Sequence, residues 1–492
     1  MDNVIERIIE PKAQLDDSRK TFTNPMLKAM IVPLVIESVL QMVVGLADGI
    51  MSSRAGYGVN TGVGLDNMII TVFIYLFTAL SAGGAVVVSQ YIGSRDERNA
   101  NLAASQVFHI SGILSLVSMA MMLLFGSGLI NAVFREREPE VLEACRTYMW
   151  IVALSFPANA VYNAGAAVFR AMGSTRITMW VTLAANIVNV IGNAIGVFGL
   201  HAAEHGASFG AAAVAWPTTI AWYVAAGVMT WLCFGSAKSE ALLKRLKIEK
   251  KANVTVQAPD ILKLNGSMSR RILGVAIPNS IENTLFQASK VVISFVLIAS
   301  LAKQHVDANS NGQTFWSLAA CMGTAMNTVF MTVIGQCVGA GDNDAAEWYM
   351  RKLMRLSFVL AFVWNVLVML LTPLLMPLYD FSPADAETKA LIILVVAIHN
   401  LFSGTVQPFS GPLSGGLRAA GDVKFTMWAS IFCTVICRTL FSFLLVRWIR
   451  WPDGFEMGVI GIAVAMVLDW CIKAALDIWR FRSGKWKNRK LI

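Results

Sequence analysis

Long apolar runs recur from one end of this chain to the other, and they constrain its fold more than any other feature. A run of about 20 mostly apolar residues crosses the hydrocarbon core of a bilayer, about 30 Å thick, as a helix. Of the 492 residues, 56% are hydrophobic and 14% are charged, whereas soluble domains carry about 25% charged residues. The sequence therefore predicts an all-α integral membrane protein and excludes a soluble enzyme with a single anchor.

The apolar pattern predicts twelve transmembrane helices. They fall at about residues 28–52, 66–92, 101–128, 141–168, 177–200, 208–234, 272–301, 313–338, 353–378, 387–411, 424–448 and 458–480. If the N-terminus is cytoplasmic, most Lys and Arg residues lie in cytoplasmic segments, as the positive-inside rule requires. We therefore expect a multi-pass protein of the cell (inner) membrane, with both termini in the cytoplasm.

The longest connection, residues 235–271, is basic and then polar, and it separates two groups of six spans. The predicted domains are a cytoplasmic N-terminal segment (1–24), an N-terminal six-helix bundle (25–234), a cytoplasmic linker (235–271), a C-terminal six-helix bundle (272–480) and a basic cytoplasmic tail (481–492).

The two bundles repeat each other in sequence. The matching segments are VPLVIE (32–37) with IPNSIE (277–282), SQYIGSRDERNA (89–100) with GQCVGAGDNDAA (335–346), and RAMGSTRITMW (170–180) with RAAGDVKFTMW (418–428). Six spans per half is an even number, so both halves face the same way and form a parallel, pseudo-symmetric repeat. Two bundles around a central cleft are a transporter architecture, in which one bundle rocks against the other.

The first span, IVPLVIESVLQMVVGLADGIM, carries Glu37, Gln41 and Asp48. They fall within about 40° of one another on a helical wheel, so they form one stripe, which must face a cavity or the bundle interior. A carboxylate there can exchange a proton, or hold a hard cation together with other oxygens. The alternatives are that Asp48 is a hydrated helix end and that Glu37 is a satisfied polar group.

The fifth span presents Asn186, Asn189 and Asn193 on one face. Their amides could complete a site around Asp48. Hydrogen bonds between helices, which are common in membranes, are the equally weighted alternative.

In the second half, Glu282 is predicted near the membrane midplane, where it could couple ions or contact substrate. Lys290 and Arg438 could instead pair with Glu282 or Asp469. Asp469 and Lys473 are spaced to form an ion pair on the last span. Two further polar residues of the tenth span, His399 and Asn400, could support a site.

Motifs of enzymes are absent from the sequence: there is no HExxH, no plausible GxSxG and no P-loop. The seven cysteines are interpreted as packed free thiols, so no metal or cofactor is expected. No basic and aromatic module suggests nucleic-acid binding. The chain is therefore not expected to be an enzyme.

Together these features resemble the multidrug and toxin extrusion (MATE) family, bacterial type. The resemblance rests on P…AD in the first span, Q-x-x-G-x-x-[DN] after the second and eighth spans, R-A-x-G-x-x-[RK]-x-T before the fifth and eleventh, and RFRSGKW near the end. It implies a V-shaped molecule with a central cleft that works as a monomer. It also implies multidrug efflux: export of small organic, often cationic or amphipathic, compounds in exchange for H⁺ or Na⁺.

The resemblance also implies site residues. Asp48 matches the family's acid in the first span, Glu282 matches its P-x-x-x-E motif, and Asn193 is neutral where some relatives have a second acid. A flippase for lipid-linked or polymer precursors, built on a similar two-bundle frame, is the alternative. It would require a strongly basic cleft, whereas the embedded charges here are mixed.

Overall fold

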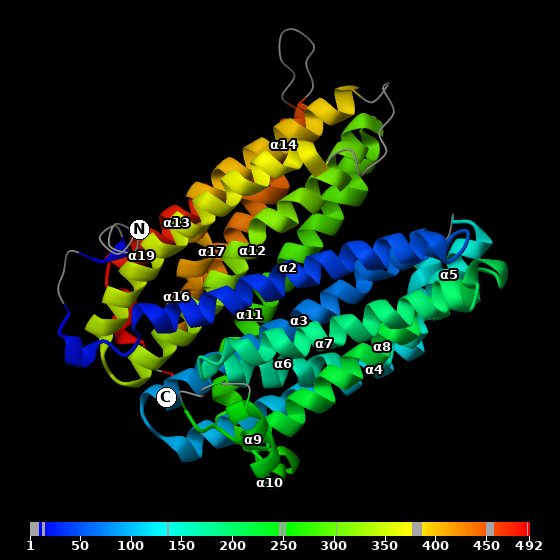
Figure 1. Cartoon of the computed structure of the whole chain (residues 1–492). Helices are drawn as coiled ribbons and strands as arrows, with labels where there is room; N and C mark the ends of the chain where they lie inside the picture. The colour runs from blue at the N-terminus through cyan, green and yellow to red at the C-terminus, as the bar shows by residue number, and fades with distance from the viewer. Residues whose placement is uncertain are drawn as a thin grey trace. The chain divides into compact units, whose positions relative to one another are not determined.

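The computed structural model of the chain describes residues 9–11, 15–134, 137–245, 248, 252–301, 303–375, 386–448, 457–489 and 491–492. Throughout these residues the regular structure is helical (Figure 1). Parts of four predictions lie outside them: much of the N-terminal segment, some of the linker, the end of the ninth span and residue 490 of the tail. The chain divides into two compact units, Lys28–Ser280 (the N-unit) and Met1–Leu27 with Ile281–Ile492 (the C-unit).

The N-unit contains six predicted spans. Its elements are α2 (Asn24–Arg54), α3 (Val59–Gly93), α4 (Glu97–Val133), α5 (Pro139–Ala153), α6 (Phe156–Ala171), α7 (Thr175–Ala194) with the π-helical turn η2 (Ile195–Gly199), α8 (Ala207–Cys233), the short α9 (Ala237–Arg245) and α10 (Ala258–Leu262), and the first half of α11 (Gly266–Val292). Both boundaries between the units fall inside helices, α2 and α11.

The C-unit contains the other six. After α11 come η4 (Ile293–Leu297), η5 (Ile298–Ser300), α12 (Lys303–Gly339), α13 (Asn343–Leu375), α14 (Ala386–Thr405), α15 (Gln407–Ser410), α16 (Pro412–Ala419), α17 (Val423–Phe432), the π-helical η8 (Cys433–Leu440), α18 (Phe441–Phe443), η9 (Leu444–Trp448), α19 (Gly458–Arg482) and η10 (Lys485–Asn488).

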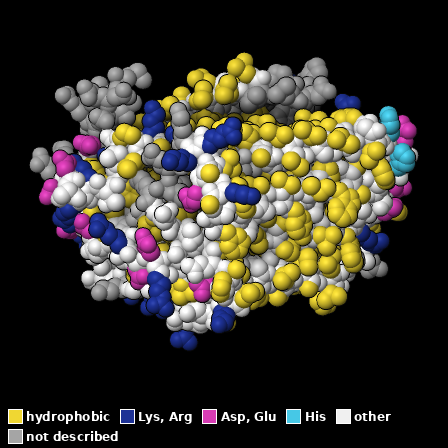
Figure 2. Space-filling view, turned by 60° about the horizontal axis from the view of Figure 1, so that its bottom comes forward, with side chains coloured by type: hydrophobic (Ala, Val, Ile, Leu, Met, Phe, Trp, Pro, Cys, Tyr) yellow, Lys and Arg dark blue, Asp and Glu magenta, His cyan; other side chains and the backbone are white. Residues whose placement is uncertain are grey.

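These helices account for all twelve predicted spans and confirm the fold class. Ten described helices are long and apolar enough to cross a membrane, and α5 with α6 forms an eleventh span bent by 48°. The twelfth, α11, is less apolar because it carries Glu282, Gln287 and Lys290 among other polar residues. Large hydrophobic side chains such as Leu124 and Leu370 are exposed, and Figure 2 shows broad hydrophobic areas on the visible surface, as a bilayer-facing protein requires.

Small residues bring helices close together inside the N-unit. Its hydrophobic core is built mainly from α3, α5, α6 and α8. A Cβ added at Gly62 of α3 would lie 2.9 Å from the backbone oxygen of Val141 in α5. Only glycine allows this approach, which is typical of helix contacts in membranes.

The repeated R-A-x-G motif ends a helix in the same way in both units. In the N-unit, Gly173 has a φ of 75°, and Ser174 N–H bonds back to Phe169 C=O at 2.9 Å. In the C-unit, Gly421 has a φ of 95°, and Asp422 N–H bonds to Leu417 C=O at 3.0 Å. This is the Schellman ending, which needs glycine at the left-handed position.

The arginine of the same motif pairs with the glutamate of the repeated P-x-x-x-E motif. In the N-unit, Arg170 Nη2 lies 2.6 Å from Glu37 Oε1, and Thr178 donates to Glu37 Oε2 at 2.9 Å. In the C-unit, Arg418 Nη1 lies 2.6 Å from Glu282 Oε2, and Lys473 Nζ lies 2.8 Å from Oε1. Each pair joins the first span of a half to the end of the fourth span of the same half, α2 to α6 in the N-unit and α11 to α16 in the C-unit.

The Q-x-x-G-x-x-D motif also has a structural role. Asp96 accepts a hydrogen bond from Asn99 N–H in the first turn of α4, and Asp342 accepts one from Ala345 N–H in the first turn of α13, at 3.0 and 2.9 Å. Both aspartates therefore cap the helix that follows.

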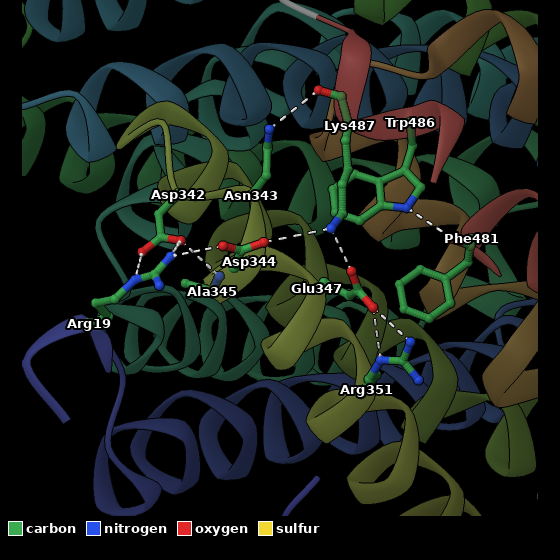
Figure 3. Close-up of polar contacts among 10 residues, drawn as sticks. All are labelled: Arg19, Asp342, Asn343, Asp344, Ala345, Glu347, Arg351, Phe481, Trp486 and Lys487. Atoms are coloured by element: carbon green, nitrogen blue, oxygen red, sulfur yellow. Dashed lines mark hydrogen bonds and ion pairs between the residues drawn. The ribbon is translucent and has the colours of Figure 1, made fainter. Parts of the chain in front are cut away.

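The two ends of the chain both contact the start of α13 in the C-unit. Figure 3 shows Arg19 against Asp342, with Arg19 Nε 2.8 Å from Asp342 Oδ2. In the same view Lys487 Nζ lies 2.6 Å from Glu347 Oε2. The linker, in contrast, belongs to the N-unit, where Gln106 of α4 donates to the backbone oxygens of Asp260 and Lys263.

The repeated ion pairs give a stability prediction. Arg170→Ala leaves Glu37, which is 3% exposed, without its cation, so we expect a loss of about 3–5 kcal/mol. Arg418→Ala leaves Glu282 with Lys473 and should cost less. The melting temperature of the purified protein measures both.

The control for this prediction is Arg351→Ala, which removes a surface ion pair with Glu347 and should change stability by less than about 1 kcal/mol. Equal losses in Arg170→Ala and Arg351→Ala would contradict the assignment of a buried structural pair.

The contact of Arg19 with Asp342 gives a pH prediction. The Arg19 guanidinium holds the pKa of the Asp342 carboxyl below its ordinary value, which is about 3.9. The contact therefore contributes stability above that ordinary value and loses it as the pH falls through the lowered pKa. We expect the fluorescence anisotropy of a dye on Ser18→Cys to drop as the pH falls below about 4.

In Arg19→Gln the anisotropy should be low already at neutral pH, and this acid transition should disappear. An unchanged transition in Arg19→Gln would show that another group holds the segment.

Candidate functional site

Asp48 of α2 is held by two amides of α7 in the N-unit. Asn193 Nδ2 donates to Asp48 Oδ1 at 2.7 Å. Asn189 Nδ2 donates to both carboxylate oxygens, at 2.9 and 3.1 Å. Asn189 and Asn193 are buried, whereas Asp48 is partly exposed. The structure therefore brings these three predicted residues together.

A third helix supports the arrangement. Thr218 of α8 donates a hydrogen bond from Oγ1 to Asn189 Oδ1 at 3.1 Å. Helix α8 comes this close because Gly192 has no side chain: a Cβ there would lie 2.7 Å from Pro217 Cβ. Asn189 is thus oriented from one side by Thr218 and from the other by Asp48.

The chemistry available is that of a small oxygen-rich site. The carboxylate of Asp48 accepts three amide hydrogen bonds and, among the described residues, has no ion-pair partner. Asn193 Oδ1 is buried without a hydrogen-bond partner in the described part of the chain. Carboxylate and amide oxygens are ligands for hard cations, and a carboxylate also takes a proton.

The other polar residues predicted near Asp48 lie elsewhere. Gln41 is exposed on α2. Asn186 is half-buried, and its Nδ2 has no hydrogen-bond partner within the described residues. The predicted stripe therefore separates into Glu37, locked by Arg170, and Asp48, held by amides.

In the C-unit the pairing of Arg438 with Asp469, one of the predicted alternatives, is present, whereas the predicted pairing of Lys473 with Asp469 is replaced by a contact with Glu282. Lys473 contacts Glu282 at 2.8 Å, and Arg438 Nε lies 3.5 Å from Asp469 Oδ2. The ion pair expected between Asp469 and Lys473 is not among those in the described residues. Lys290 lies against aromatic rings rather than a carboxylate.

The two polar residues of α14 are buried. The His399 ring packs near Trp316 and Trp470, with ring centroids 6.3 and 6.1 Å away. Neither His399 nor Asn400 has a side-chain hydrogen bond to the described residues.

Sequence reasoning missed several embedded polar groups. Asp66 of α3 is fully buried and accepts a hydrogen bond from Cys145 Sγ at 2.8 Å. Asp477 of α19 is equally buried, and Asp422 pairs with Arg480. An acid inside or beside an apolar span was the signal for each aspartate, as it was for Asp48. Thr218 gave no signal, because a threonine in an apolar helix is ordinary.

Metal-binding clusters are not found: the described residues contain no group of three His, Cys, Asp or Glu side chains that could hold a metal ion.

Two curated proteins resemble the chain along nearly its whole length. It is 23% identical over 486 residues to "Probable multidrug resistance protein NorM" of Thermotoga maritima, covering 98% of this chain and 96% of that protein. It is 26% identical over 474 residues to "Uncharacterized transporter YisQ" of Bacillus subtilis, covering 95% of each.

Solved transporter structures share the fold. A MOP superfamily transporter from Pyrococcus furiosus superposes with a TM-score of 0.82 at 19% identity, covering 97% of both chains. A MATE protein in complex with MaL6 superposes with a TM-score of 0.80, also at 19% identity and 97% coverage of both chains.

The family comparison matches the two repeated halves separately. The MatE family profile matches residues 33–195 and 278–444. These segments contain the repeated P-x-x-x-E and R-A-x-G motifs and, in the first half, Asp48 with its two asparagines. The chain therefore belongs to the MatE family of membrane transporters.

Proposed function

We propose that this protein is a secondary active antiporter that exports small organic compounds in exchange for H⁺ or Na⁺, with Asp48 as the coupling residue. Membership of the MatE family and relatives named as multidrug resistance proteins support efflux. The two curated relatives described above are named as a multidrug resistance protein and as a transporter, which favours the exporter over the flippase alternative. The proposal includes an inner-membrane location, cytoplasmic termini and a functional monomer.

The observation that carries the coupling assignment is the contrast between three embedded acids. Glu37 and Glu282 each contact a cationic side chain within 3 Å. The hydrogen bonds that Asp48 accepts from the described residues come from the neutral amides of Asn189 and Asn193. A carboxylate already paired with a guanidinium has little affinity for another cation, whereas one held by amides can accept it.

The geometry suggests how a cation could change the structure. In the present arrangement both asparagines donate N–H groups to Asp48, which is the hydrogen bonding of an ionised carboxylate. Protonation, or Na⁺ bound at the carboxylate, removes part of this acceptor capacity. The amides then have to turn or separate from α2, and the relative position of α2 and α7 changes. We propose that this shift favours the rocking of one bundle against the other.

Substrate flux in proteoliposomes tests the coupling residue. We expect flux in the wild type to follow an imposed pH or Na⁺ gradient, each applied alone. Asp48→Asn removes the charge but keeps the shape, so the gradient-driven flux should fall at least about tenfold.

Asp66→Asn is the matched control, since it makes the same change at another acid of the N-unit, outside this site, and should keep the gradient response. A wild type that responds to neither gradient would refute antiport, and undiminished coupling in Asp48→Asn would refute the assignment of this residue.

A second prediction concerns Thr218. Thr218→Val removes the hydroxyl that donates to Asn189 Oδ1 and that also lies 3.0 Å from Val214 C=O of its own helix. The hydrogen bond that orients Asn189 is worth about 0.5–1.5 kcal/mol. We expect the cation concentration for half-maximal flux to rise about two- to tenfold, with a similar maximal rate.

Thr219→Val is the neighbouring control, because its hydroxyl donates to Ile151 C=O, away from Asp48. An equal effect of the two substitutions would contradict a positioning role for Thr218.

A further inference from the structure

We infer that the C-unit contains a binding pocket for the carboxylate of an aromatic organic anion, formed around Lys290 and Arg438. The inference deepens the proposed function, on which it rests, by naming a substrate class. It concerns a part of the molecule separate from the Asp48 site and depends on the arrangement of charge within the C-unit alone.

The pocket is a cavity of 130 Å³ between α11, α12, α19 and the two π-helical segments η4 and η8. Its polar lining comes from both cations and three neutral groups, and its apolar lining from aliphatic side chains. The polar residues are Lys290, Ser294, Asn309, Gln313 and Arg438. π-helical segments are rare and often occur at functional sites. Here one carries Ser294 and the other Arg438.

The charges around the cavity do not balance. Arg438 is 2% exposed and meets Asp469 only through Nε, at 3.5 Å. Its Nη1 and Nη2 atoms have no hydrogen-bond partner in the described part of the chain. Lys290 has no acidic partner among the described residues, since Glu282 on the same helix is taken by Arg418 and Lys473. Within the residues that the structure describes, Lys290 and Arg438 together therefore have one neighbouring carboxylate, that of Asp469, and it contacts Arg438.

Aromatic rings compensate for part of this imbalance. The Lys290 ammonium lies 4.9 Å from the Trp316 ring centroid and 5.2 Å from that of Phe286. The Arg438 guanidinium lies 4.2 Å from the Phe286 ring. Cations are attracted to the faces of aromatic rings at these distances. These contacts explain how Lys290 is tolerated, but they leave the Nη atoms of Arg438 unsatisfied, and buried donors normally have acceptors.

A bound carboxylate would supply what is missing. It provides two acceptor oxygens, which match the paired Nη donors of a guanidinium, and a negative charge that balances Lys290. The neutral lining residues Ser294, Asn309 and Gln313 can donate further hydrogen bonds.

Size and surroundings favour an aromatic acid. A cavity of about 150 Å³ lined by apolar groups accommodates benzene, so 130 Å³ suits one ring or the head group of a larger compound. The apolar lining, from Ile293, Ile298, Ile462 and Met466, suits the ring of such an acid, and Phe286 and Trp316 lie against the two cations without lining the cavity. Benzoate is therefore the simplest probe.

The experiment compares benzoate with benzylammonium, which has the same ring and the opposite charge. Binding of each radiolabelled probe to the purified full-length protein is measured by equilibrium dialysis at pH 7 and constant ionic strength. The variants are Lys290→Met, which removes the charge and keeps the length, Lys290→Arg, which keeps the charge, and Asp48→Asn, which alters the proposed coupling site only.

We expect benzoate to bind more tightly than benzylammonium. Lys290→Met should weaken benzoate binding about tenfold or more, because hydrogen bonds to charged groups contribute about 1.5–3 kcal/mol. Lys290→Arg and Asp48→Asn should bind benzoate nearly as the wild type does. Chloride or phosphate that competes as strongly as unlabelled benzoate would overturn the aromatic carboxylate class.

If a variant expresses poorly, its melting temperature, measured with and without benzoate, provides a second test of the same pocket. Without ligand, Lys290→Met should melt higher than the wild type, because it removes a half-buried cation that lacks a carboxylate partner among the described residues. Benzoate should raise the melting temperature of the wild type and not that of Lys290→Met.

Equal binding of the two probes, or full benzoate binding by Lys290→Met, would overturn the inference while leaving antiport at Asp48 intact. If Asp48→Asn loses gradient coupling but still binds benzoate, both the coupling role of Asp48 and the carboxylate pocket are supported. If the protein binds benzoate but shows no antiport, only the proposed function is refuted.

Discussion

The buried pair of a glutamate and an arginine in each half is the interaction on which the rest of the structure depends. Glu37 with Arg170, and Glu282 with Arg418, join the first helix of a half to the helix that ends in the R-A-x-G turn. Removing Arg170 leaves Glu37 buried and uncompensated, which is far more costly than losing a surface contact, whereas Glu282 without Arg418 keeps Lys473. The pairs therefore fix the position of α2 and α11 within their units.

That constraint separates Glu37, which is held in an ion pair, from Asp48, the coupling residue proposed above, along one helix. Glu37 anchors the first part of α2 by its contact with Arg170, and Asp48 lies about three turns further along. Because the anchor is already satisfied, Asp48 can keep a carboxylate that only amides contact. Thr218 and the close approach of α8 at Gly192 then orient the amides. The proposed site thus lies on a helix that the ion pair of Glu37 and Arg170 holds in place.

The sequence predicted the helices, the repeat and the residues that meet at Asp48, because apolar length, duplicated motifs and one-face spacing are local properties. It could not predict which charges pair. Lys473 is spaced to contact Asp469 on its own helix, yet it contacts Glu282 of α11, because helix packing in the C-unit brings those side chains together. The repeated motifs also proved to be turns, caps and anchors in the structure. Asp48, which has Ile293 at the equivalent position of the repeat, is not part of that shared frame.

The same comparison of halves has an electrical consequence. Where the N-unit has Asp48 and its asparagines, the C-unit has Lys290 and Arg438, so one duplicated frame carries opposite charge in its two copies. An exporter that moves an organic anion out for each cation that enters transfers two charges in the same direction per cycle. A membrane potential of 100 mV contributes about 2.3 kcal/mol for each of them. The voltage across the membrane, and not only an ion gradient, would then drive export, and a transport current would accompany it.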